Sequence, residues 1–97
     1  MTILDDLSRN YRAAFLRYLP RREEAALARS YEIGRAAVTD GVSLLELARV
    51  HHEVLLEVLR DTSAEELPRL ADAAADFLLE ALATYDMAQR RSPTRAG

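Results

Sequence analysis

Cysteine, lysine and tryptophan are absent from this chain of 97 residues, and glycine and proline occur three times each. Without cysteine the chain has no disulfide, no thiolate ligand for zinc and no cysteine nucleophile, and a reducing compartment is its natural setting. Three glycines are too few for the glycine-rich loops that hold phosphates and dinucleotides. We therefore expect a cytoplasmic protein without a nucleotide site or a thiol-based active site.

Positive charge is carried by arginine alone, with 13 bases against 16 acids and a net charge of −3. Positive and negative residues alternate along the chain, so it lacks the cluster of positive charge that binding to the phosphate backbone of a nucleic acid requires. No apolar run approaches the roughly 20 residues of a membrane span, and the amino terminus has no signal-peptide pattern. We expect neither a nucleic-acid partner nor a membrane.

What the sequence does contain is helical periodicity. Apolar residues recur at spacings of three and four in successive segments, whereas the alternation typical of strands is missing. The helical segments are expected at about residues 3–19, 22–40, 44–60 and 68–90. The predicted fold class is therefore all-α, a four-helix bundle. It forms one domain over residues 1–91, and a disordered tail follows at residues 92–97.

Local signals mark the ends of these segments. Pro20 stops the first helix, and Gly41 closes the second as a left-handed residue. Ser43 and Glu46 have the spacing of a capping box at the start of the third. Pro68 would break a helix that began directly after the preceding Asp-Thr-Ser turn. We therefore expect a short turn first and a long fourth helix that begins near Pro68.

The adjacent His51 and His52 are the only histidines, and His52-Glu53 begins like the helix of a zinc protease. The second histidine of that motif belongs at position 56, which is Leu56, so the motif is incomplete. His51 falls on the predicted core stripe and is better explained as a partly buried, hydrogen-bonded side chain. Acidic pairs lie at helix starts, where they offset the helix dipole. We expect no catalytic residue, metal ligand or cofactor.

Four leucines fall off the main apolar stripes of their helices, namely Leu45, Leu56, Leu59 and Leu79. A domain of this size cannot easily bury them all, and a contiguous patch of exposed leucines would mark a protein interface.

A collinear set of residues spans almost the whole chain: Tyr11, Arg17, Tyr18, Leu19, Glu24, Leu27, Arg35, Val50, His51, Val54, Leu55, Phe77, Leu78, Leu79, Glu80, Tyr85, Asp86, Met87 and Ala88. This set resembles the amino-terminal domain of RsbU-type phosphatases, which regulate stress sigma factors. The resemblance implies an all-α homodimer that docks a switch kinase-like protein and thereby controls an attached PP2C-type phosphatase. That enzyme frees the sigma factor of the general stress response by partner switching.

In that family the docking surface combines the exposed side of the second helix with the adjoining fourth helix. The resemblance therefore implies partner-binding roles for Glu24, Ala28 and Leu79. Ala28 departs from the pattern, because a larger aromatic residue would be a better anchor at that place. The docking domain uses up the chain, so we expect no enzyme activity from it.

An alternative function is a small-ligand or stress-signal sensor, in which the bundle core or the dimer seam holds an apolar molecule. Its basis is a path of small residues formed by Gly34 with Ala71, Ala73, Ala74 and Ala75. The same path is explained by close packing of helices, which small residues permit.

Overall fold

The computed structural model describes residues 2–91, which form four α-helices and one 3-10 turn. The helices are α1 (Ile3–Tyr18), α2 (Glu24–Thr39), α3 (Leu44–Arg60) and α4 (Leu67–Arg91), and the 3-10 turn η1 (Ala64–Glu66) directly precedes α4. No strand occurs in the described part, so the predicted all-α, four-helix bundle is confirmed. The tail predicted at residues 92–97 lies outside the described residues.

The first helix begins at Ile3, as expected, and Thr2 caps it. The backbone N–H of Asp5 donates to the Thr2 hydroxyl at 3.0 Å, and the Thr2 N–H donates to the Asp5 carboxylate at 3.3 Å. This reciprocal pair is a capping box, in which Asp5 is the third helical residue. At the other end α1 stops at Tyr18, two residues before Pro20, as predicted.

The turn between α2 and α3 has the predicted construction. Gly41 has a φ of 77°, the left-handed conformation that glycine adopts without strain. The N–H of Gly41 donates to the Val38 carbonyl, and the next N–H donates to the carbonyl of Ala37, which together form a Schellman motif. Ser43 and Glu46 then exchange capping-box hydrogen bonds at 3.0 and 3.1 Å.

The approach to α4 also follows the expectation. The predicted short turn is η1, and Pro68 is the second residue of α4, where its missing N–H costs nothing. Ser63 stands at the cap position before η1, but its side chain makes no cap hydrogen bond. The Thr62 hydroxyl instead donates to the carbonyl of Val58 at 2.6 Å.

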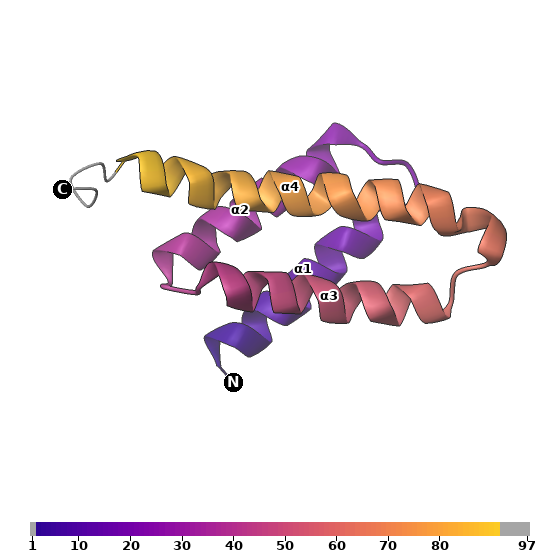
Figure 1. Cartoon of the computed structure of the whole chain (residues 1–97), viewed down its shortest axis with the longest axis horizontal. Helices are drawn as coiled ribbons and strands as arrows, with labels where there is room; N and C mark the ends of the chain where they lie inside the picture. Colours follow the sequence, from indigo (N-terminus) through magenta and orange to yellow (C-terminus); the bar gives the residue numbers. More distant parts are fainter. Residues whose placement is uncertain (1, 92–97) are drawn as a thin grey trace.

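Helices α2 and α4 approach each other closely and run in the same direction (Figure 1). A Cβ atom added to Gly34 would lie only 2.3 Å from the carbonyl oxygen of Ala81 on α4. The glycine in the middle of α2 is therefore required by the neighbouring helix, as its position predicted. Helix α3 runs antiparallel to α4, and the two cross in front of α1 and α2 in this view.

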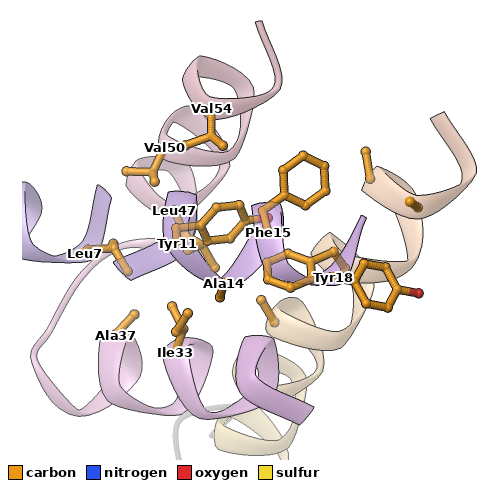
Figure 2. Close-up of a cluster of buried hydrophobic side chains, with 14 of the residues drawn as sticks. Leu7, Tyr11, Ala14, Phe15, Tyr18, Ile33, Ala37, Leu47, Val50 and Val54 are labelled. Carbon is orange, nitrogen blue, oxygen red and sulfur yellow. The ribbon is translucent and has the colours of Figure 1, made fainter. Parts of the chain in front are cut away.

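An aromatic cluster fills the centre of the bundle, where α1 lies between α2 and α3 (Figure 2). The ring of the fully buried Phe77 of α4 packs against three rings of α1. Its centroid lies 5.1 Å from that of Tyr11, 5.3 Å from that of Phe15 and 5.6 Å from that of Tyr18. Full burial of such a side chain contributes about 1.5–3 kcal/mol. Leu4 and Leu44 fall on the apolar stripes of their helices by spacing, but they are exposed, because each stands in the first turn of its helix at the end of the bundle.

Candidate partner-binding surface

Helix α2 presents one outward stripe that contains two of the implied site residues. Glu24 is its first residue, and Ala28, Tyr31 and Arg35 follow at offsets of four, seven and eleven, which places all four on one side of the helix. Glu24, Ala28 and Arg35 are exposed, and Tyr31 is half-buried. The stripe is thus open to a partner along its length.

Helix α4 contributes the third implied residue, Leu79, of which 63% is exposed. Ala83 and Met87 continue from it at successive offsets of four, and Met87 is exposed as well. An apolar stripe of this kind on the outside of a domain is costly in water unless something covers it.

Contacts on either side of Leu79 establish its level against α2. Three residues before it, Asp76 forms an ion pair with Arg22, which precedes α2. Two residues after it, Ala81 is the residue that packs on Gly34. Because the two helices are parallel, Leu79 lies at the level of the first turns of α2, where Glu24 and Ala28 stand.

The two stripes are joined by a side-chain contact further along. The Tyr31 hydroxyl donates to the sulfur of Met87 at 3.5 Å. Beside this contact lies an open hollow of ≈ 220 Å³, which is lined by Tyr31, Arg35, Val38, Thr39, Thr84, Met87 and Ala88. We call the stripes and this hollow the α2–α4 surface, defined by Glu24, Ala28, Tyr31, Arg35, Leu79, Ala83 and Met87. The sequence reasoning missed Tyr31 and Met87, although their helical spacing from Ala28 and Leu79 was a usable signal.

Acidic side chains border the apolar centre of this surface. Glu24 is exposed at one end, Asp76 precedes Leu79 by one turn, and Glu80 directly follows it. The Asp76 carboxylate is partly balanced by Arg22. The border is therefore net acidic, which favours a partner with basic residues around an apolar anchor.

His51 takes part in a hydrogen bond between two helices. Its Nδ1 lies 2.7 Å from the hydroxyl of Tyr11, so a hydrogen bond links α3 to α1. Burial, and then the charge of His52, lower the pKa of His51, and burial raises the pKa of Tyr11 well above its ordinary value. The predicted partly buried, hydrogen-bonded histidine is confirmed, and His52 is exposed as expected.

The small residues expected to form one path do not do so. Gly34 packs against Ala81 and Thr84, whereas Ala71 and Ala75 are exposed on α4. Close helix packing therefore explains the glycine, and the observation that motivated a ligand-binding core is removed.

Within residues 2–91, no group of three or more histidine, aspartate or glutamate side chains is placed to hold a metal ion. The described helices also include none with the length and apolarity needed to cross a membrane.

Comparison with curated proteins gave no significant match, and comparison with solved structures gave none either. The family model described as "Phosphoserine phosphatase RsbU, N-terminal domain" matches residues 9–88, which covers α1 from its second turn through to the last turns of α4. This family is regulatory and non-catalytic, and it acts in the control of sigma factors under stress. With four helices in the predicted order and a match over most of its length, the chain belongs to the family of RsbU amino-terminal domains.

Proposed function

We propose that this domain docks a switch kinase-like regulatory protein on its α2–α4 surface and so controls a PP2C-type phosphatase of a stress sigma-factor system. The domain does so as a homodimer in the cytoplasm. One observation carries the docking proposal. Glu24 and Ala28, on the first turns of α2, and Leu79, on the adjacent α4, are the residues that the family resemblance implies, and all three are exposed.

Leu79 is the main anchor on this side of the proposed complex. Its side chain is 63% exposed, and burial of a leucine side chain contributes about 1.5–3 kcal/mol. Such an apolar anchor within a charged border is the usual arrangement of a binding hot spot.

Ala28 changes how the partner fits. An alanine gives no projecting anchor, so the partner must supply the side chain that fills the space beside α2. The hollow next to Tyr31 and Met87 can accept such a side chain. The docking surface is thus reshaped relative to a family pattern with an aromatic residue at this place.

The experiment is a calorimetric titration of the domain with a switch kinase-like protein from the same organism. We expect Leu79→Asp to weaken binding at least about 100-fold, because about 3 kcal/mol is lost when an anchor is replaced by a charge at an acidic border. Leu16→Asp on α1 is the matched control, since Leu16 is 49% exposed and lies off this surface. Circular dichroism of both variants should equal that of the unmodified domain.

Full affinity of the Leu79→Asp variant would contradict the proposed surface. Equal loss in both variants would also contradict it, because the effect would then not depend on the α2–α4 surface.

A further inference from the structure

A groove runs along the outside of the molecule between α1 and α2. Two hollows lie end to end in it, a wide one of ≈ 440 Å³ and a narrow one of ≈ 180 Å³, and Asn10 and Arg29 line both of them. We call the two hollows together the α1–α2 groove. Besides the shared residues, the wide hollow is lined by Ala13, Ala14, Arg17, Glu23, Ala25 and Ala26.

The exposed positions that line the groove have the spacing of a contact between helices. On α1 they are positions 3, 6, 10, 13 and 17, and on α2 they are positions 25, 29, 32 and 36. Intervals that alternate between three and four are those of the contact positions in packed helices. Helix α1 has 16 residues, or about 24 Å, so the groove has the length of a helix of about four turns.

Alanine bounds the wide hollow on both helices. Ala13 and Ala25 are exposed, Ala26 is half-buried and Ala14 is buried. A methyl group projects little from the backbone, and helices with small side chains at the contact approach to roughly 8 Å between their axes. A third helix therefore has room to lie against both α1 and α2, with larger apolar side chains of its own in the hollow.

Two arginines line the wide hollow without an acidic partner. Among the side chains that the structure describes, neither Arg17 nor Arg29 forms an ion pair. Glu23, the acidic residue of this hollow, is itself paired with Arg21 at 3.8 Å. The wide end is therefore net positive, although the net charge of the chain is −3. Carboxylates are the complementary groups for a partner at this end.

The narrow end of the groove has the opposite sign. It is lined by Asp6, Glu32 and Asp40, of which Asp6 is paired with Arg9. Charge along the groove thus changes from positive to negative. This change favours an occupant that carries its acidic residues at one end only.

We propose that the α1–α2 groove binds an amphipathic helix of another protein, with carboxylates at the end that lies beside Arg17 and Arg29. Leucine-sized side chains of that helix fill the space over Ala13 and Ala25. A small anion is a poorer fit, because exposed arginines hold an anion only weakly in water and an anion leaves the alanines uncovered.

This groove is distinct from the α2–α4 surface. Ala25 and Arg29 each follow a residue of that surface by one position, Glu24 and Ala28, and one position is a rotation of about 100° around the helix. The two surfaces therefore lie on different sides of α2, and the inference does not rest on the proposed function. The Leu79→Asp variant should bind the acidic helix with unchanged affinity.

Fluorescence anisotropy with a labelled helical peptide tests this inference. The peptide is as long as α1, has leucine along one side and carries glutamate beside the leucines at one end only. We expect it to bind the domain, and to bind less tightly as salt is raised, because salt screens exposed charge pairs. A peptide with lysine in place of each glutamate should bind at least about ten-fold more weakly.

The variant Arg17→Glu/Arg29→Glu should bind the glutamate peptide at least about ten-fold more weakly, because two attractive charge pairs become repulsive. The matched control is Arg49→Glu/Arg60→Glu on α3, which makes the same change in net charge at exposed positions outside the groove and should retain full affinity. Circular dichroism checks that both variants are folded.

A second variant tests the apolar part of the groove. Ala13→Leu/Ala25→Leu fills the wide hollow without a change in charge, at two exposed positions where a larger side chain is tolerated. It should also weaken binding at least about ten-fold. Full affinity of this variant would show that charge alone attracts the peptide, and would overturn the groove as a helix site.

Four other results would overturn the proposal. They are full affinity of the folded arginine variant, equal loss in its α3 control, equal binding of the glutamate and lysine peptides, and no binding of the glutamate peptide. Complete displacement of the peptide by inorganic phosphate at equal concentration would indicate a small-anion site and would also overturn the helix as the occupant.

Discussion

At the scale of single residues, Gly34 shows most directly how one helix dictates the sequence of another. Ala81 and Thr84 of α4 occupy the space in which a side chain at this position would lie. The Thr84 hydroxyl donates a hydrogen bond to the carbonyl oxygen of Ala81 at 2.7 Å, so this buried hydroxyl already has a hydrogen-bond partner. The close packing of α2 and α4 therefore depends on the missing Cβ.

Replacement of Gly34 by alanine tests this contact. Helix propensity alone favours alanine by about 1 kcal/mol, but overpacking against backbone costs about 1–3 kcal/mol. We expect the overpacking to dominate, because the added Cβ would stand 2.3 Å from a backbone oxygen that cannot rotate away. Urea unfolding should show a lower midpoint for the variant. A higher midpoint would mean that the two helices are less closely packed than described.

The hydrogen bond between Tyr11 and His51 predicts a dependence of stability on pH. The pKa of folded His51 lies below its ordinary value of 6.5, mainly because of burial, so the unfolded chain takes up the proton more readily. The contribution of neutral His51 to the free energy of unfolding should therefore be complete above pH 6.5 and should decrease as the pH falls toward 5. The loss should be below about 1 kcal/mol, because the ring is only partly buried and solvent screens its charge.

The measurement compares urea midpoints at pH 7.5 and 5.5 for the unmodified chain and for His51→Asn, whose amide can replace Nδ1. The variant should lose part of the pH dependence, whereas His52→Asn on the exposed side should retain it. An unchanged pH dependence in His51→Asn would show that other groups cause it.

The sequence alone identified several of these residues correctly, and physical reasons separate the successes from the failures. Gly34 and His51 were interpretable because each was anomalous on its own helix. Periodicity alone would place Leu4 and Leu44 in the core, because it gives the side of a helix but not whether a neighbour extends far enough to cover it. For Tyr31 and Met87, helical spacing could have placed each beside a site residue of its own helix, but their contact depends on the register between α2 and α4, which no local pattern encodes.

At the scale of elements, the chain contains a natural comparison between two serines. Ser43 accepts a hydrogen bond from Glu46 and caps α3, whereas Ser63 has the same spacing to Glu66 but makes no cap bond. The difference arises because η1, and not an α-helix, follows Ser63. A capping-box pattern thus predicts a cap only where a regular α-helix begins next to it.

We expect Ser43→Ala to lower the free energy of unfolding by about 1 kcal/mol, the usual cost of a lost N-cap. Ser63→Ala should change it by less than about 0.5 kcal/mol, as is typical of exposed positions without such a bond. Thermal unfolding of both variants under the same conditions makes the comparison. Equal losses would contradict the difference between the two serines.

Helix order and approximate boundaries were predictable because spacings of three and four dominate every long segment. The start of α1 at Ile3 agrees with the expectation, and the structure adds the Thr2–Asp5 capping box that fixes it. Threonine at a cap and acid in the first turn are both ordinary at helix starts.

At the scale of the whole molecule, α4 has two different sides. Its side toward α2 carries Leu79 and Met87, and its side toward α3 carries Leu78 and Leu82. The exposed leucines expected from the sequence are all found exposed, and three of the four belong to α3. That only Leu79 belongs to the α2–α4 surface could not be predicted from spacing, because it depends on which helices are neighbours and in which direction they run.

The central claim is that the domain docks a regulatory protein on each α2–α4 surface of a dimer. The most direct test is the mass of the complex with the switch kinase-like protein, measured by light scattering with the partner in excess. The account predicts two domains with two partners for the unmodified chain, and a domain dimer without partner for Leu79→Asp. A complex of the Leu79→Asp variant with the same mass as the unmodified complex would contradict it.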